Sequence, residues 1–215
     1  MHIADGVLPL PTLVGGFVLA GGWIAVTARK LTPDDMPRVA VMSAAFFVGS
    51  ALSIPLGVTS VHLLLHGLVG IVLGVHALLA ISIGLVFQKL LLMHGGITTL
   101  GINACIMGFP AVALGLLYGR LVRSRSLNVQ TILAALLTAL TVAVSTLLAA
   151  GALVTGGESF FATAGVFLIG HLPVMLIEGL IAAVVIRFLS QVKPELLGGP
   201  RPAAENTLEE QPHAS

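Results

Sequence analysis

Apolar stretches long enough to cross a membrane recur along almost the whole chain, separated by short polar connections. A helix needs about 20 mostly apolar residues to cross roughly 30 Å of hydrocarbon. The pattern predicts spans at 9–28, 37–54, 61–75, 77–93, 102–120, 128–154 and 161–190. We therefore expect an all-α integral membrane protein with about seven transmembrane helices.

Two parts of this pattern depart from simple spans. The seventh region is too long for one straight helix, and His171 and Pro173 interrupt it, so we expect a kink or a partly inserted segment there. Residues 1–192 are expected to form a single membrane domain. The segment 193–215 is polar and rich in Pro and Glu, which is typical of a disordered tail.

Composition supports the membrane assignment, because 57% of the residues are hydrophobic, only 9% are charged, and the mean hydropathy is +1.07. A soluble domain carries about 25% charged residues. The net charge of +1 gives no indication of nucleic-acid binding. The lone Cys105 excludes internal disulfides and a thiolate metal cluster. The chain has no phosphate-binding loop, nucleophile elbow or His-Glu-x-x-His pair, so we do not expect an enzyme.

The basic residues predict the orientation, since connections rich in Lys and Arg stay in the cytoplasm. Every Lys and Arg except Lys89 falls on one side of a seven-span chain whose N-terminus is outside and whose C-terminus is inside. The predicted tail 193–215 is then cytoplasmic. The first two residues, the connection before His62 and the loop 94–103 share the outer face.

The N-terminus is the strongest candidate for metal chemistry. His2 is too large a second residue for the initiator methionine to be trimmed, so we expect Met1 to keep a free α-amine. That amine, the amide of His2 and its imidazole would close a five-membered and a six-membered chelate ring around one ion. Such nitrogen coordination suits Ni(II) and Cu(II), and an outer imidazole such as His62 could be a fourth ligand. The alternative is that a His after Met is chance.

His62 and His66 form the second candidate. Thr59 and Ser60 are expected to cap a helix in which the two histidines lie one turn apart on the same face. His62 would then be a ligand, and His66 a second ligand or a group that orients the first. Alternatively, both are interior histidines that form hydrogen bonds with neighbouring helices.

The loop 94–103, which begins with His94 and ends with Asn103, is polar and rich in Gly. Its glycines allow close approach of another segment or a ligand. Asn103 and the loop threonines would form hydrogen bonds with groups near the ion or hold the N-terminal segment in place, and His94 is a possible extra ligand. An ordinary turn with mutually satisfied polar groups is the alternative.

His171 and Glu178 are two helical turns apart and share a face. A carboxylate inside a membrane must face the protein interior or a partner. Glu178 is therefore a candidate proton relay, ion-pair partner or docking contact, and the sequence does not choose among these roles.

With these residues identified, residues 1 to 192 resemble the CbiM/NikM family, the substrate-capture membrane subunits of energy-coupling-factor transporters for cobalt and nickel. The resemblance lies in Met-His-Ile-Ala-Asp-Gly at the start, Gly-Val-Thr-Ser-Val-His-Leu around His62, Gly-Gly-Ile-Thr-Thr-Leu-Gly-Ile-Asn ending at Asn103, and Pro-Val-Met-Leu-Ile-Glu-Gly around Glu178.

The resemblance implies seven membrane helices and an ion held by the amine of Met1, the amide and imidazole of His2, and the imidazole of His62. It implies partners as well: a CbiQ-like membrane coupling subunit, CbiO-like cytoplasmic ATPases that hydrolyse the ATP, and often a small accessory membrane subunit. The transported substrate would be Ni²⁺ or Co²⁺, taken up across a bacterial or archaeal cytoplasmic membrane.

Two other functions are compatible with the residues alone. One is a stand-alone, proton-coupled permease in which His66, His171 and Glu178 relay protons. The other is a structural membrane scaffold that retains no metal. The sequence does not separate nickel from cobalt, because both ions accept imidazole nitrogen.

Overall fold

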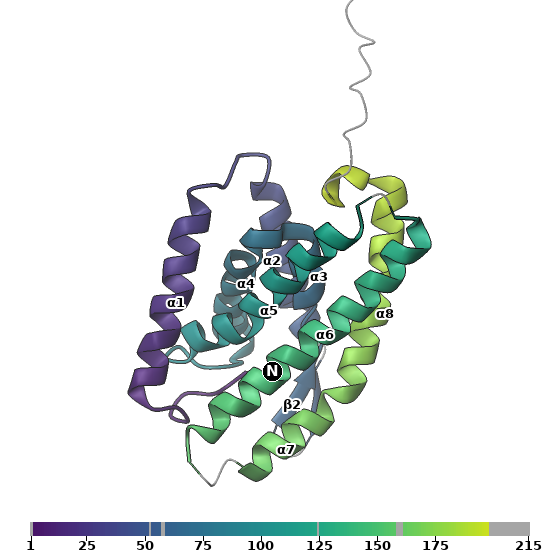
Figure 1. Cartoon of the computed structure of the whole chain (residues 1–215). Coiled ribbons are helices and arrows are strands. Elements are labelled where there is room, and N and C mark those ends of the chain that lie inside the picture. Colours follow the sequence, from purple (N-terminus) through teal and green to yellow (C-terminus); the bar gives the residue numbers. More distant parts are fainter. Residues whose placement is uncertain (1, 52, 57–58, 124, 158–160, 198–215) are drawn as a thin grey trace, which may run out of the picture.

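The computed structural model describes residues 2–51, 53–56, 59–123, 125–157 and 161–197, without the side chains of 53–56 and 59–61. Helices make up nearly all of this part of the chain (Figure 1). The elements are α1 (Leu10–Ala28), α2 (Met36–Ala51), β1 (Ser53–Leu56), β2 (Thr59–His62), α3 (His66–Leu73), the 3-10 helix η1 (Gly74–His76), α4 (Ala77–Leu92), α5 (Leu100–Leu121), α6 (Leu127–Val154), α7 (Phe161–Gly170), α8 (Leu172–Val192) and the 3-10 helix η3 (Pro194–Leu197).

The helices have the length and apolar character of membrane spans. Among the described residues, five helices or helical runs are long and apolar enough to cross a bilayer: Leu10–Ala28, His66–Leu92, Leu100–Leu121, Leu127–Val154 and Phe161–Val192. The sixth apolar helix, α2, has 16 residues. Large apolar side chains on their outer faces remain exposed, as expected for surfaces that meet lipid. The expectation of a multi-pass membrane protein is confirmed.

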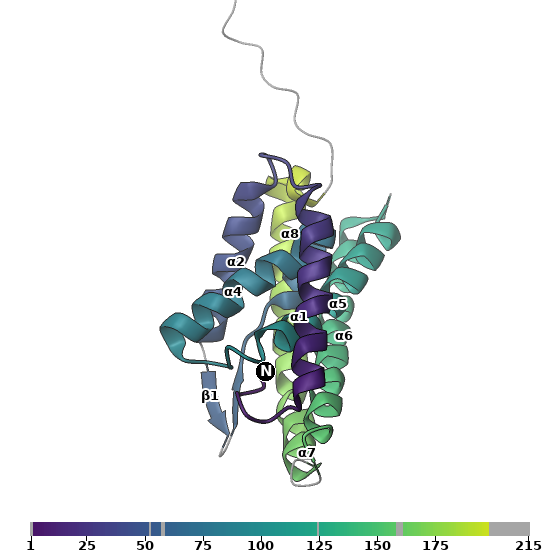
Figure 2. The same ribbon diagram turned by 90° about the vertical axis from the view of Figure 1, so that its left-hand side faces the viewer.

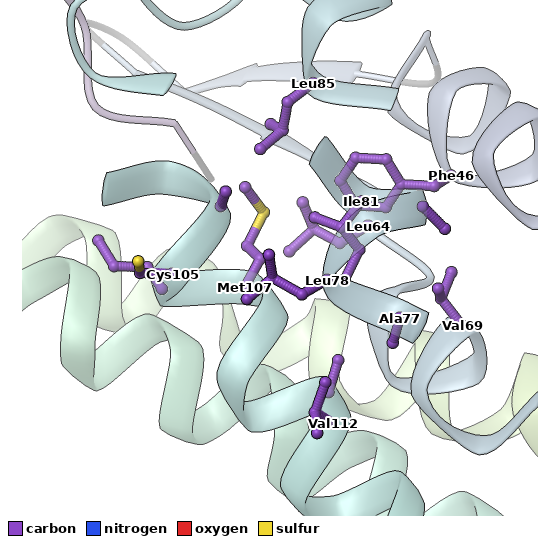
Figure 3. Packing of buried hydrophobic residues seen from close by; sticks show 14 of the residues in the cluster. Phe46, Leu64, Val69, Ala77, Leu78, Ile81, Leu85, Cys105, Met107 and Val112 are labelled. Atoms are coloured by element: carbon purple, nitrogen blue, oxygen red, sulfur yellow. The ribbon is translucent and has the colours of Figure 1, made fainter. Parts of the chain in front are cut away.

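The core lies where α3, α4 and α5 cross. Buried side chains from these helices and from α2 pack together, including Phe46, Leu78, Ile81 and Met107 (Figure 3). Helix α3 contacts α5 without intervening side chains, since a Cβ atom on Gly70 would lie 2.1 Å from the Ala111 carbonyl oxygen. Small residues permit this backbone contact between membrane helices.

The third expected span is wrong as a continuous helix. Residues 59–62 instead form β2, which pairs antiparallel with β1 so that Ser53 lies opposite His62. Leu65 then has a φ of 54°, which interrupts helical geometry, and α3 begins only at His66. Thr59 and Ser60 therefore do not cap a helix, and His62 and His66 do not share a helical face.

The break expected in the last apolar region is confirmed. Helix α7 ends at Gly170, His171 forms the turn, and Pro173 lies in the first turn of α8. Proline is tolerated at that position because the first amides of a helix have no intrahelical acceptor.

The basic connections gather at one end of the bundle, at the top of Figure 1. Arg38 at the start of α2 donates to the Glu195 carbonyl in η3, and Arg187 near the end of α8 donates to Asn128 Oδ1 at the start of α6. The β1–β2 hairpin and the N-terminal segment lie toward the other end (Figure 2). Residues 198–215 of the predicted tail lie outside the described residues.

Candidate metal centre

The N-terminal strap, defined as residues 2–9, runs from the side of the hairpin to the start of α1 (Figure 2). Asn103 in the first turn of α5 pairs with the strap in both directions. The Ile3 amide donates to Asn103 Oδ1 at 3.1 Å, and Asn103 Nδ2 donates to the Ile3 carbonyl at 3.1 Å. The Thr99 hydroxyl donates to the same carbonyl at 2.7 Å. These buried bonds fix the backbone that follows His2.

Asp5 ties the strap to the loop that precedes α5. Its Oδ1 accepts hydrogen bonds from the Thr98 amide at 2.9 Å and the Thr98 hydroxyl at 2.5 Å, and its Oδ2 accepts one from the Ile97 amide at 3.2 Å. The bond from the Thr98 hydroxyl is the main reason that the pKa of Asp5 is lowered. The strap lies directly against Gly96, where a Cβ atom would be 2.1 Å from Asp5 Oδ1.

His2 is held between Gln88 and His62. Its Nε2 lies 2.5 Å from Gln88 Oε1 on α4, and its Nδ1 lies 3.0 Å from His62 Nε2 at the end of β2. The two rings stack with their centroids 4.7 Å apart. Burial lowers the pKa of His2 well below its ordinary value, so the imidazole is neutral at pH 7.

The outer partners of both rings determine where their protons lie. An amide oxygen only accepts, so His2 Nε2 carries the proton that bonds to Gln88 and His2 Nδ1 carries a lone pair. His62 Nδ1 faces the Leu63 carbonyl at 3.3 Å, and its Nε2 faces His2 Nδ1 at 3.0 Å. When each ring carries its proton on the nitrogen that faces an oxygen, the two inner nitrogens both offer electron pairs toward the same point. This pair of tautomers is the one that two imidazole ligands of a single ion require.

The separation of these nitrogens matches two adjacent ligands of one ion. Metal–imidazole bonds are about 2.0–2.1 Å long, so two nitrogens at a right angle on one ion lie roughly 2.9 Å apart. The observed separation is 3.0 Å. Within the described residues, however, no three His, Cys, Asp or Glu side chains are placed to hold an ion together. The sequence predicts the amine of Met1 and the amide of His2 as the further ligands.

His94 is the third imidazole at this end of the bundle. Its ring is nearly parallel to that of His62 at 6.0 Å between centroids, and it lies 6.3 Å from the His2 ring. The His94 ring lies farther from His2 and from His62 than those two rings lie from one another. The structure thus brings together His2, His62 and His94, with Asn103 beneath the strap.

His66, His171 and Glu178 lie elsewhere, in the interior between α3, α6 and α8. His66 Nε2 is 3.0 Å from the Ser145 hydroxyl, and its Nδ1 is 3.9 Å from Glu178 Oε2. His171 Nδ1 faces the Phe167 carbonyl at 2.8 Å. His66 is not among the rings that contact His2. Met1 and the side chains of Thr59 and Ser60 lie outside what the structure describes.

The sequence predicts that Gln88 pairs with a group inside the bundle, but it does not identify His2 as that partner, and it does not predict the role of Asp5. Gln88 is fully buried within an apolar helix, and a polar side chain in a membrane span is itself a signal of a specific contact. Its partner is 86 residues away, so spacing could not identify it. Asp5 belongs to the motif Met-His-Ile-Ala-Asp-Gly, but nothing in that motif identifies Thr98 as its partner.

The chain is similar to known proteins along most of its length. Residues 2–196 match the CbiM family, described as "Cobalt uptake substrate-specific transmembrane region". A protein of Haemophilus influenzae described as a metal transport protein is 36% identical over 203 residues, which are 92% of this chain and 97% of that one. A protein of Haloquadratum walsbyi described as cobalt transport protein CbiM is 35% identical over 216 residues. These cover 92% of this chain and 97% of that protein.

Two further similarities concern assembly and fold. A protein of Methanocorpusculum labreanum described as a fused cobalt transport protein CbiMQ is 32% identical over 219 residues, which are 91% of this chain and 36% of that protein. A solved structure of a transition metal transporter superposes with a TM-score of 0.76 at 24% identity, covering 89% of this chain and 93% of that one. It shows that the fold is shared.

Proposed function

Because the chain belongs to the CbiM family of cobalt-uptake membrane proteins, we propose that it captures Co²⁺ or Ni²⁺ at the outer face of a cell membrane for uptake. The single observation that carries this proposal is the approach of His2 Nδ1 to His62 Nε2 at 3.0 Å, the separation of two adjacent imidazole ligands on one ion. A transition-metal ion is the cation that suits two imidazole nitrogens.

The proposed ligand set has four nitrogens: the amine of Met1, the amide of His2, His2 Nδ1 and His62 Nε2. Nδ1 is the ring nitrogen that closes a six-membered chelate ring with the amide of its own residue. The hydrogen bond to Gln88 leaves this nitrogen available. His94 is not one of the four ligands and borders the site instead. The segments that carry or support the ligands include Thr59, Ser60 and Asn103.

The topology proposed for this function has seven spans, with the N-terminus outside. The third span would combine the extended segment after His62 with the short helix α3. The basic end of the bundle then faces the cytoplasm, as the distribution of Lys and Arg predicts. Residues 1–192 would be the metal-capture domain and 193–215 a cytoplasmic tail.

We propose that the chain works with a CbiQ-like membrane coupling subunit, and the fused CbiMQ relative supports that partner. ATP hydrolysis would reside in separate CbiO-like subunits, and a small accessory membrane subunit would complete the complex. The chain itself would not be an enzyme.

A proton-coupled permease is the second candidate, favoured by the buried approach of His66 to Glu178 at 3.9 Å. The two functions differ in what drives transport. Vesicles containing only this chain should accumulate Co²⁺ under a pH gradient if it is a permease. Under the capture function, they should bind the ion without accumulating it until the ATPase-containing complex is supplied.

Metal binding by the purified chain tests the capture function directly. Equilibrium dialysis against Co²⁺ and against Ni²⁺ should show one ion per chain. His62→Ala should weaken binding by about 100-fold or more, above the 10–100-fold loss typical of removing a bond that merely orients a ligand. His76→Ala, in η1, is the matched control and should bind as the wild type does. Equal binding by His62→Ala and wild type would overturn the proposal.

A further inference from the structure

Glu178 is a fully buried carboxylate that the proposed ligand set does not use. It lies on α8, and its Oε1 accepts a short hydrogen bond from the Leu64 amide. Its other oxygen, Oε2, faces His66 Nδ1. A side chain from α8 thus holds backbone that lies two residues after His62.

The backbone at this point lacks regular secondary structure. Strand β2 ends at His62, α3 begins at His66, and the three residues between belong to neither. Leu65 has a left-handed φ of 54° and provides no side-chain cap for α3. A buried amide outside regular secondary structure needs an acceptor. Glu178 provides that acceptor for the Leu64 amide from another helix.

The segment 62–66 is held from several sides. His62 is paired with Ser53 in the hairpin, and His66 bonds to Ser145 on α6 at 3.0 Å. The Leu64 side chain is fully buried and lies near Leu78 and Ile81 (Figure 3). Among these restraints, the hydrogen bond from the Leu64 amide to Glu178 connects the segment to α8.

We propose that Glu178 is a positioning residue that clamps the segment after His62 and thereby holds His62 Nε2 against the ion site. This inference rests on the proposed capture function, because it concerns the same ligand. It also gives α8 a direct connection to the ion site. A displacement of α8 that withdraws the carboxylate from Leu64 would loosen His62 while leaving the chelate at the strap intact.

A double-mutant cycle between Glu178 and His62 tests this positioning role. Ni²⁺ affinity is measured by equilibrium dialysis for wild type, Glu178→Ala, His62→Ala and the double variant, each shown to be monodisperse in detergent. Glu178→Ala should weaken binding by about tenfold or more. The double variant should be within about twofold of His62→Ala, since a residue that acts through His62 has nothing left to position. Additive losses would overturn the inference.

Counting nitrogens around bound Cu²⁺ by electron paramagnetic resonance gives a second, independent readout. Wild type should show four nitrogens, and both Glu178→Ala and His62→Ala three. Glu178→Gln keeps an acceptor for the Leu64 amide, so it should retain four nitrogens and bind Ni²⁺ within about threefold of wild type. A folded Glu178→Gln protein with three nitrogens would overturn the clamp. Wild type without bound metal would instead overturn the capture function itself.

The matched control is Leu176→Ala, which lies on the exposed face of the same helix. It should leave the nitrogen count at four and the affinity unchanged. A loss as large as that of Glu178→Ala would show that α8 tolerates no truncation, and the positioning role would fail.

Discussion

Asn103 and Ile3 are joined by two hydrogen bonds, one in each direction and both 3.1 Å long. The Asn103 amide thus pairs with the strap backbone as a neighbouring strand would, at the residue next to His2. Both groups are buried, so the pairing is shielded from competing water.

Replacing Asn103 by Asp should therefore impair metal binding. The carboxylate would still accept from the Ile3 amide, but it would place a second acceptor against the Ile3 carbonyl, where Nδ2 now donates. We expect Ni²⁺ affinity to fall by about 10–100-fold, as for other groups that orient a ligand. Isothermal titration of the purified variant measures the change. Unaltered affinity would mean that the strap is held without this pairing.

Metal binding should depend on the amide oxygen of Gln88, which accepts the hydrogen bond from His2. Gln88→Leu removes the acceptor for His2 Nε2–H, so the imidazole loses both its orientation and its fixed tautomer. Affinity should drop about 10–100-fold, whereas Gln88→Glu, which keeps an acceptor, should bind more tightly than Gln88→Leu. Gln130→Leu, at the start of α6, is the control and should bind normally. Normal binding by Gln88→Leu would show that Gln88 does not fix the tautomer of His2.

Gly96 should not tolerate even a methyl group. A Cβ atom there would lie 2.1 Å from Asp5 Oδ1 and 2.7 Å from the Asp5 amide nitrogen, so Gly96→Ala should push the strap off the loop. Gly119→Ala is a matched control within α5, because a Cβ atom there meets nothing within 4 Å. The control should be neutral or slightly stabilising. Thermal unfolding with and without Ni²⁺ should show metal-induced stabilisation in the control and its loss in Gly96→Ala.

The pH dependence of metal binding should arise mainly from the amine of Met1 and the amide of His2, and less from the imidazole of His2. Burial lowers the pKa of His2, so that ring is already neutral at pH 7 and does not compete through protonation as the pH falls toward 6. The amine, with an ordinary pKa of about 7.7–8.0, and the amide must each release a proton on binding. Affinity should therefore decrease as pH falls, with about two protons released per Ni²⁺. Calorimetry in buffers of different ionisation enthalpy counts them, and a count of zero would exclude the amide ligand.

Local patterns identified the long helices well. The spans expected at 9–28 and 128–154 correspond to α1 (Leu10–Ala28) and α6 (Leu127–Val154) because hydrophobic length alone determines them. The expected helix at 61–75 is wrong because residues 59–62 pair with residues 53–56 in a hairpin, which hydrophobic length does not indicate. Composition cannot reveal the register of such a pairing.

The site was predictable only in part for a similar reason. His2, His62 and the loop before α5 carry visible chemistry, so residue type and topology sufficed to bring them together. The acceptor for His2 is 86 residues away on Gln88, and the acceptor for the Leu64 amide is 114 residues away on Glu178. Contacts of this kind depend on how helices pack, and a single sequence does not specify that packing.

The central claim, that a free N-terminus chelates the ion together with His62, is tested most directly by unmasking that terminus in one sample. The protein is prepared with an N-terminal extension that a site-specific protease removes to leave Met1 as the first residue, and Ni²⁺ binding is measured before and after cleavage. We expect weak binding before cleavage and tight, stoichiometric binding after it, with no such gain in His62→Ala. Equally tight binding by the uncleaved protein would contradict the account.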